Sequence, residues 1–287
     1  MNKQVKTGFD DRIVNYEYIH GNQQEDFVQL IKALNPIETD TILDGCGGYM
    51  DVSKKILNRF SDKKPDIYVL DESSLQLSRA KEKQLVPNNH LIQGDISNIP
   101  FPDNKFDKVV VKMGMHEMPL EKQRTAFQEC YRVLKPGGKL VIWDLALPDD
   151  ETQKLFQDII REKDRLCGFD FLVKNRYFQK YSELVELFNQ AKFTNVLEEF
   201  PIKSHLSIER RLSEFVSKDR LQILNSKTKI TSEEDDVLYH NAHNRLKSLC
   251  EYIRNRVPEH LKQQLQFHDT GSNIEMVISK VIMSGKK

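Results

Sequence analysis

The stretch Thr41-Ile42-Leu43-Asp44-Gly45-Cys46-Gly47-Gly48-Tyr49-Met50 decides the fold class of this chain. A short apolar run ends in a carboxylate, and three glycines follow within four positions. Glycine lets the backbone turn sharply and approach a ligand closely. The apolar spacing from Val52 to Phe60 predicts that a helix starts directly after the turn. Because a helix N-terminus presents N–H groups without helical partners, this strand, turn and helix indicate a site for a nucleotide-type cofactor.

Strand-like and helix-like segments alternate from residue 41 to residue 145. The expected strands are 41–43, 67–70, 90–93, 108–112 and 139–143, and the expected helices are 52–60, 74–84 and 120–134. The last of these helices is expected to stop at Lys135-Pro136-Gly137-Gly138. Such alternation predicts an α/β fold in which helices cover both faces of a parallel sheet.

The chain beyond residue 145 has a more helical pattern. Amphipathic helices are expected at 181–191, 207–224 and 237–256, and late strands at 193–200 and 273–283, the first ended by Pro201. The sequence therefore predicts four parts. These are a helical lid segment at 1–40, a cofactor-binding core at 41–200, a helical insert at 201–270 and a final strand at 271–287 that completes the core sheet.

The bulk composition excludes several classes of protein. Lysine and arginine number 43 and aspartate and glutamate also number 43, and this zero net charge argues against a dedicated nucleic-acid binder. The four cysteines form no C-x-x-C pair, so no metal site is expected and reduced thiols in a cytoplasmic protein fit best. We see neither a signal peptide nor an apolar run of about 18 residues, so no membrane span is predicted. His240 and His243 share a helix face, which we interpret as solvated rather than as a metal site.

Two carboxylates follow the glycine turn, at the ends of the next two strands. Asp71 lies about 20 residues past the turn and can accept hydrogen bonds from both hydroxyls of an adenosine ribose. Asp95 stands beside Ile96, and this pair suits an adenine, because the carboxylate accepts from the exocyclic amine while the apolar side chain packs on the ring. Either carboxylate alone could cap a strand end, as we expect for Asp144, but their order favours a cofactor site.

Taken in order, these motifs and Leu134-Lys135-Pro136-Gly137-Gly138 resemble the class I S-adenosylmethionine (SAM)-dependent methyltransferases. The resemblance covers residues 40–145 well and implies a Rossmann-like fold. Its seven-stranded sheet would be mostly parallel, with an antiparallel last strand. The implied cofactor is SAM, with S-adenosylhomocysteine as the product.

The resemblance also implies which residues bind the cofactor. The methionine part would lie in the turn formed by Asp44, Gly45, Cys46, Gly47 and Gly48. Asp71, with Glu72 beside it, would bind the ribose, and Asp95 and Ile96 would bind the adenine. Val111 and Lys112 would approach the sulfonium through their backbone. Tyr16, in the lid segment, is expected to contact the cofactor, with simple packing as the alternative.

The glycine turn departs from the family spacing acid-x-G-x-G-x-G. If Asp44 is the acid, Cys46 and Met50 stand where the first and third glycines would be. Alternatively, Gly45-Cys46-Gly47 is the common G-x-G and one residue is missing after Asp44. Both alignments keep the cofactor prediction, because SAM has no phosphate and needs no gap of pyrophosphate size.

His116 is the candidate catalytic residue. It follows the fourth strand, at the edge where ligands bind in open parallel sheets. A histidine can take a proton from a hydroxyl near neutral pH, so one hypothesis makes His116 a general base. The other makes it a substrate-orienting or structural residue.

The predicted function is SAM-dependent methyl transfer to a small-molecule acceptor of lipid-like or secondary metabolism. Oxygen is favoured as the methylated atom, with carbon or nitrogen as alternatives. The helical insert is expected to form an acceptor cap or a homodimer contact. The competing hypotheses are a macromolecular acceptor, a dinucleotide oxidoreductase and a non-methylating protein on the same fold.

Overall fold

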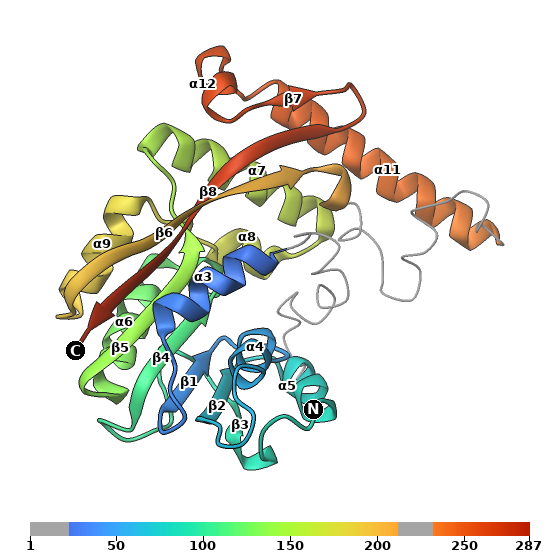
Figure 1. Cartoon of the computed structure of the whole chain (residues 1–287). Coiled ribbons are helices and arrows are strands. Elements are labelled where there is room, and N and C mark those ends of the chain that lie inside the picture. The colour runs from blue at the N-terminus through green and yellow to red at the C-terminus, as the bar shows by residue number, and fades with distance from the viewer. Residues whose placement is uncertain (1–22, 212–231) are drawn as a thin grey trace. The chain divides into compact units, whose positions relative to one another are not determined.

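The computed structural model describes residues 23–211 and 232–287. Tyr16, most of the lid segment and most of the expected helix at 207–224 lie outside the described residues. The chain divides into two compact units (Figure 1). The described part of the larger unit comprises 23–149, 175–202 and 279–287, and that of the smaller unit comprises 150–174, 203–211 and 232–278.

The sheet has the strand order β3-β2-β1-β4-β5-β8-β6, and β7 pairs with β8 outside this path. Strands β1 to β5 pair in parallel, whereas β8 runs antiparallel to β5. The predicted mostly parallel sheet with an antiparallel last strand is therefore confirmed, and the short β7 adds an eighth strand. The bounds are β1 (Thr41–Gly45), β2 (Asp66–Asp71), β3 (Leu91–Gln93), β4 (Phe106–Lys112), β5 (Leu134–Leu145), β6 (Thr194–Ser207), β7 (His268–Asp269) and β8 (Ile274–Lys286).

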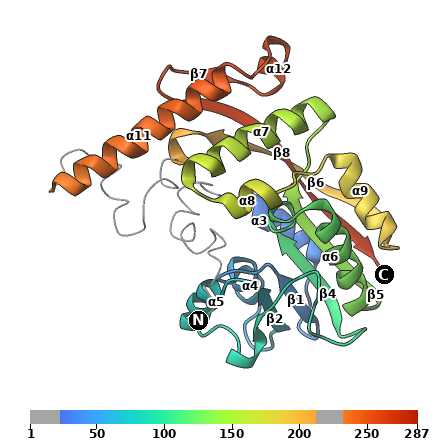
Figure 2. The same ribbon diagram turned by 180° about the vertical axis from the view of Figure 1, so that it is seen from behind.

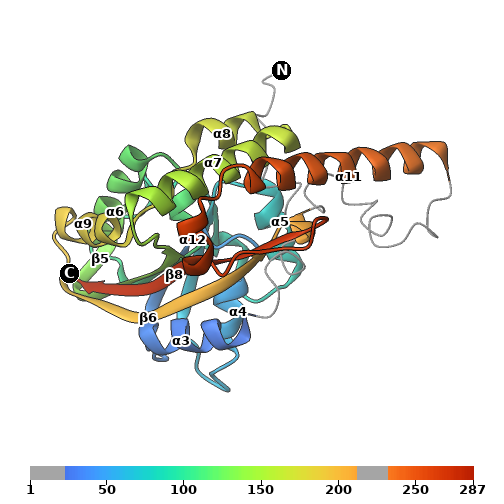
Figure 3. The same cartoon turned by 90° about the horizontal axis from the view of Figure 1, so that it is seen from above.

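Helices of the larger unit cover both faces of its sheet (Figures 1 and 3). On one face lie α3 (Gln24–Leu34), α4 (Asp51–Leu57) and α5 (Ser74–Glu82), and on the other lie α6 (Leu120–Val133) and α9 (Tyr181–Gln190). Valines in the middle of β4 contribute to the apolar core on both faces. Val110 packs in the cluster on the α3 face, and Val109 and Val111 pack in the cluster on the α6 face. A strand buried on both faces is expected to be continuously apolar, and all three valines are fully buried.

The predicted end of the strand at 193–200 is wrong. Strand β6 continues through Pro201 to Ser207, where a helix was expected to begin. Proline removes a hydrogen-bond donor, which a strand at the edge of a sheet tolerates, and β6 is the last strand of the order. In contrast, α6 ends at Val133, with one residue between it and the Lys-Pro-Gly-Gly segment that was expected to stop it.

In the smaller unit, α7 (Asp150–Cys167) packs along α11 (Glu233–Arg254) (Figure 2). The Ser232 hydroxyl accepts from the backbone N–H of Asp235 and caps α11. This cap explains why the helix begins four residues before the predicted start at 237. The short helices of this region are α8 (Asp170–Asn175) and α12 (Glu259–Gln264). Within residues 23–211 and 232–287, no helix combines the length and the hydrophobicity that crossing a membrane requires.

Candidate active site

Asp44 lies beneath the glycine turn at the end of β1 and is fully buried. Its Oδ2 accepts hydrogen bonds from the Ser53 hydroxyl at 2.6 Å and from the Ser53 backbone N–H at 3.1 Å. Burial raises the pKa of Asp44 to about 6, although these two bonds act in the opposite direction. Its Oδ1 is buried and accepts no hydrogen bond within the described part of the chain. The turn therefore covers a carboxylate oxygen that a positively charged ligand would satisfy.

Space and backbone geometry both constrain the turn. A Cβ on Gly47 would lie 2.7 Å from a Val69 methyl group and 2.9 Å from the Asp44 carboxyl carbon, so only glycine fits there. Cys46 and Met50 have φ angles of 53° and 72°, which lie in the left-handed region that favours glycine. These are the two residues that replace glycines if Asp44 is the acid of the motif. The backbone therefore favours the first of the two alignments of this turn.

Asp71 ties the end of β2 to the turn. Its Oδ2 accepts from the backbone N–H of Gly48 at 2.9 Å, and its Oδ1 accepts from that of Ser73 at 2.9 Å. These two bonds orient the carboxylate at the end of β2, beside the glycine turn.

Lys122, on α6, connects the two other acidic candidates. Its ammonium lies 2.7 Å from Glu72 Oε1 and 2.8 Å from Asp95 Oδ2. The other Asp95 oxygen accepts from the backbone N–H and hydroxyl of Ser97, both at 2.8 Å. Burial by itself would raise the pKa of Asp95, but the bonds from Lys122 and Ser97 outweigh it and lower the pKa. Sequence reasoning missed Lys122, because it lies 50 positions from Glu72 and belongs to no motif.

Three further candidates differ in where their side chains lie. Ile96 is buried, and its terminal methyl group occupies the space where a Cβ on Gly45 would be. Val111 is part of the core on the α6 face, whereas the Lys112 ammonium lies 4.8 Å from the centre of the Phe27 ring on the α3 face. The side chains of Val111 and Lys112 therefore lie on opposite faces of the sheet, and their backbone lies between these faces at the end of β4.

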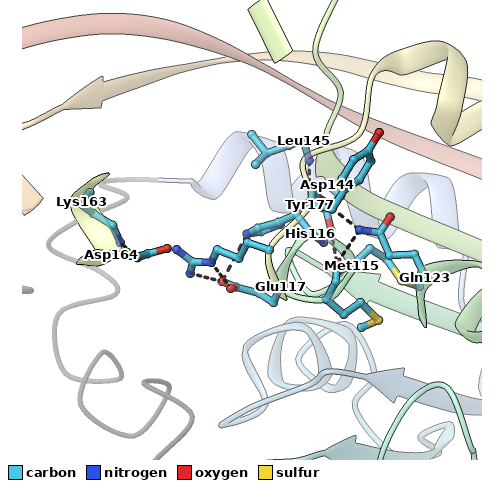
Figure 4. A network of polar contacts seen from close by, with 11 residues as sticks. Met115, His116, Glu117, Gln123, Asp144, Leu145, Lys163, Asp164 and Tyr177 are labelled. Atoms are coloured by element: carbon cyan, nitrogen blue, oxygen red, sulfur yellow. Dashed lines mark hydrogen bonds and ion pairs between the residues drawn. The ribbon is translucent and has the colours of Figure 1, made fainter. Parts of the chain in front are cut away.

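His116 lies in a 3-10 turn, Met115–Glu117, directly after β4. Its Nδ1 is 2.5 Å from Asp144 Oδ1, and its Nε2 is 3.4 Å from Glu117 Oε1 (Figure 4). The ring stacks on Phe178 with 5.4 Å between ring centres. Asp144 caps the turn as well, since its other oxygen accepts from the Met115 N–H at 2.9 Å. The expected capping role of Asp144 is thus joined by a contact with His116 that the sequence did not reveal.

Glu117 extends this network to a distant segment. It forms a two-bond ion pair with the buried Arg176, in which Nη2 lies 2.6 Å from Oε1. The carbonyl oxygen of His116 also accepts from the backbone N–H of Tyr177 at 3.1 Å. Segment 176–178 is therefore fastened to the loop after β4 by a charged pair, a backbone bond and a stacked ring.

The electrostatics of His116 bear on its predicted role. Burial would lower the pKa of the ring, but Asp144 and Glu117 outweigh it and raise the pKa to about 9. At neutral pH the ring is then mostly an imidazolium, which has no lone pair with which to accept a proton. A general base needs the neutral form, so these contacts favour another role for His116.

No cluster in the described ranges combines three histidine, cysteine or acidic side chains in a geometry suited to a metal ion. On α11, Nδ1 of His240 and Nδ1 of His243 each lie 2.8 Å from a backbone carbonyl oxygen of the preceding helical turn. Cys46 is half-buried, and loss of solvation raises the pKa of its thiol well above the usual value, which suits a packing residue.

Comparison with known proteins adds sequence evidence to this geometry. A family model described as a methyltransferase domain matches residues 45–142. A ubiquinone/menaquinone biosynthesis C-methyltransferase of Ruegeria sp. is 32% identical over 175 residues, which are 56% of this chain and 69% of the relative. The chain belongs to the class I SAM-dependent methyltransferases. The cofactor of this family is SAM.

Other members of the methyltransferase family match over varying lengths. The demethylmenaquinone methyltransferase of Geobacillus sp. is 36% identical over 122 residues, or 41% of this chain, and the chain spans only 50% of that relative's length. Among solved structures, the YcgJ protein of Bacillus subtilis superposes with a TM-score of 0.67 at 16% identity, covering 92% of this chain and 98% of that one. A phosphoethanolamine N-methyltransferase of Haemonchus contortus, solved with SAM, gives a TM-score of 0.57 at 17% identity, covering 97% and 57%. At such identities the structural matches show the fold of the methyltransferase family.

Proposed function

We propose that this chain transfers the methyl group of SAM to a small-molecule acceptor. One observation carries the proposal: Asp71 holds the glycine turn through the Gly48 N–H, and this turn follows Asp44, whose Oδ1 is buried and accepts no hydrogen bond from the described residues. A bound SAM would supply an activated methyl group on a positively charged sulfur. The acidic edge of the sheet suits such a cation, and it suits adenosine hydroxyls and an adenine amine.

The proposed contacts of the cofactor follow from these positions. The turn at Asp44–Gly48 receives the methionine part, and the backbone after Val111 faces the sulfonium. Asp71 and Glu72 bind the ribose, while Asp95 and Ile96 bind the adenine. Tyr16 stays a predicted lid contact, because it lies outside the described residues.

The acceptor is proposed to be a small lipid-like or aromatic molecule. Relatives are named as demethylmenaquinone methyltransferases and as quinone-biosynthesis C-methyltransferases, which supports methylation at carbon beside the predicted methylation at oxygen. The preference for oxygen depended on a neutral His116, and the ring's contacts weaken that reason. The acceptor-cap or dimer role of residues 201–270, and a cytoplasmic location, stay predictions.

Calorimetric titration with SAM and with S-adenosylhomocysteine tests the proposal. We expect micromolar binding of both ligands by the wild type and a loss of at least about tenfold in Asp71→Ala. Asp62→Ala is the matched control, because Asp62 is exposed on a loop before β2. Failure of folded, ligand-free protein to bind either compound would contradict the proposal, and binding of NAD instead would favour the oxidoreductase hypothesis.

A further inference from the structure

The loop at residues 94–105 joins β3 to β4 and carries the two proposed adenine contacts, Asp95 and Ile96. Its first end is fixed to β2, because the Gly94 N–H donates to the Asp71 carbonyl oxygen at 3.0 Å. The backbone polar groups of an irregular segment have no regular ladder of partners, so individual contacts must satisfy them and set its position.

Glu129, on α6, holds the other side of the adenine contacts. The backbone N–H of Asn98 closes a turn by donating to the Asp95 carbonyl oxygen at 2.9 Å. The next N–H, that of Ile99, donates to Glu129 Oε2, also at 2.9 Å. The Ile99 side chain is buried in the same apolar cluster as Ile96. The turn is therefore fixed on both sides, to β2 and to α6.

Arg132, three residues after Glu129, uses all five of its N–H donors in this region. Its Nε and Nη2 lie 2.7 Å and 2.8 Å from the two carboxylate oxygens of Glu129. The second N–H of Nη2 donates to the Ile99 carbonyl oxygen at 2.9 Å. Nη1 donates to the Phe101 carbonyl oxygen at 2.8 Å and to Asp103 Oδ1 at 2.9 Å. Lysine has three donors and no planar fork, so it cannot reproduce this set.

The same helix contains a second pair at the same spacing, Glu121 and Arg124. Its side chains are 82% and 36% exposed, and such surface pairs contribute little to stability. Glu129 is 18% exposed, and the hydrogen bonds from Arg132 lower its pKa, although burial acts in the opposite direction. The Glu129–Arg132 pair is therefore charged at neutral pH, and its bonds continue into the loop.

Ile96 connects the loop to the glycine turn. A Cβ on Gly45 would lie 2.7 Å from the terminal methyl group of Ile96, so the two segments are in close contact. A shift of the loop would therefore move both the Asp95 carboxylate and the apolar side chain that lies against the turn.

We propose that Glu129 and Arg132 are positioning residues that hold the loop at 94–105 in the shape that recognises adenine. They act on the cofactor through the loop backbone, because their bonds reach the segment that follows the turn at Asp95. A loop that is already held in its binding shape loses less conformational freedom when the ligand binds, which increases affinity. The inference rests on the proposed function, since it concerns the adenine end of that same site.

Selectivity for adenine tests this role. Calorimetry compares S-adenosylhomocysteine with S-inosylhomocysteine, in which an oxo group replaces the exocyclic amine. We expect the wild type to prefer the adenine ligand by at least about tenfold, because the oxo group has no hydrogen to donate to Asp95. In Arg132→Lys, which keeps the charge and loses the fork, we expect most of this preference to disappear.

The ratio of the two affinities separates positioning from a general structural role, because an overall loss of the site would weaken both ligands by the same factor. Arg124→Lys is the matched control on the same helix and should keep the wild-type ratio. Equal weakening of both ligands in Arg132→Lys would overturn the inference, as would a wild type that binds both ligands equally well.

Hydrogen exchange of the ligand-free protein, followed by NMR, tests the contact itself. We expect the Ile99 amide to exchange at least about tenfold faster in Arg132→Lys than in the wild type, while the amide of Leu43 in β1 is unchanged. Glu129→Gln is a second variant, which keeps an oxygen for the Ile99 N–H and loses the charged pair, and both measurements apply to it if Arg132→Lys does not fold. Unchanged exchange at Ile99 in the folded variants would contradict the inference.

The two proposals fail in distinguishable ways. A wild type that binds neither SAM nor S-adenosylhomocysteine would contradict the proposed function and leave the exchange of Ile99 as a separate result. Normal binding of both, together with an unchanged ligand ratio in Arg132→Lys, would contradict only the positioning role.

Discussion

His116 couples the protonation of the chain to its stability. Its pKa is about 9 in the folded protein, against an ordinary value of 6.5, so the folded state binds the proton more tightly than the unfolded state. The resulting stabilisation is fully present below pH 6.5 and is lost as the pH rises through 9. We expect the difference in unfolding free energy between wild type and His116→Gln to be larger at the acidic end of this window than at the basic end, by up to roughly 3 kcal/mol. Urea unfolding at both ends measures this, and a pH-independent difference would contradict it.

Removal of the charge on Asp44 should raise the stability of the ligand-free protein and weaken the binding of SAM. Its pKa is raised from 3.8 to about 6, so the folded state again binds the proton more tightly, and stability falls as the pH rises through this window. Above pH 6 the ionised carboxylate opposes folding of the ligand-free protein. We expect Asp44→Asn to raise the melting temperature at neutral pH and to weaken SAM binding about tenfold or more. Thermal unfolding and calorimetry measure these two effects. A variant that is less stable than the wild type and binds SAM normally would contradict both expectations.

The places of the acidic candidates at the strand ends could be predicted from sequence, and the surroundings of His116 could not. Asp44, Asp71 and Asp95 occupy fixed places relative to strand ends, so a pattern of short spacings reveals them. Asp144 lies 28 positions from His116 and approaches it only after β5 has paired with β4. No local pattern encodes that contact, and without it the charge on His116 could not be foreseen.

At the scale of elements, Lys122 connects α6 to the ends of β2 and β3. In Lys122→Met, Glu72 and Asp95 lose a shared cation, and Asp95 loses the group that fixes Oδ2. We expect SAM and S-adenosylhomocysteine to bind several-fold more weakly and by the same factor, because both contain the adenosine. The loss should shrink at high salt, where exposed charges are screened. Arg124→Gln, on the exposed face of the same helix, should change neither affinity, and a loss confined to one ligand would contradict this account.

The glycine turn and the loop after β4 meet where Gly114 faces Cys46. A Cβ on Gly114 would lie 2.5 Å from the Cys46 Cβ and 2.8 Å from its sulfur. We expect Gly114→Ala to destabilise the protein by roughly 1–3 kcal/mol. The double variant Cys46→Gly/Gly114→Ala should recover most of that loss, because glycine removes the clash and suits the positive φ at position 46.

Chemical unfolding of Cys46→Gly, Gly114→Ala and the double variant completes this cycle. Additive effects of the two substitutions would show that the two residues do not interact and would contradict the predicted contact.

Elements with strong periodicity were predictable, and their ends depended on contacts that sequence does not show. An amphipathic helix was expected at 237–256 and α11 occupies most of that range, but its Ser232 cap lies before the expected start. The proline in β6 suggested a strand end, although an edge strand accommodates it. Edge position is a property of the whole sheet, so residues 194–207 alone could not reveal it.

At the scale of the whole molecule, β6 and β8 each pass from one compact unit into the other. We therefore expect the two units to unfold together. Leu249→Ala empties a fully buried position on α11 in the smaller unit and should cost about 2–5 kcal/mol. Fluorescence of Trp143, the single tryptophan of the chain and part of the larger unit, should shift with the helical signal in circular dichroism.

Val237→Ala, at a position on the same helix that is 53% exposed, is the matched control and should leave the transition nearly unchanged. A fluorescence midpoint that stays in place while the helical signal unfolds earlier would show that the shared strands do not couple the units.

The strand order also determines how long two strands lack a neighbour while the chain is being synthesised. Strand β8 lies between β5 and β6 in the sheet, yet it follows β6 in the chain after roughly 65 intervening residues. A ribosome adds about 5–20 residues per second, so β5 and β6 wait on the order of 3 to 13 s for the neighbour that joins them. During this interval β5 and β6 present strand edges without partners, and such edges can recruit other chains. A chaperone that binds apolar nascent segments would therefore protect this protein most in the interval between the synthesis of β6 and the synthesis of β8.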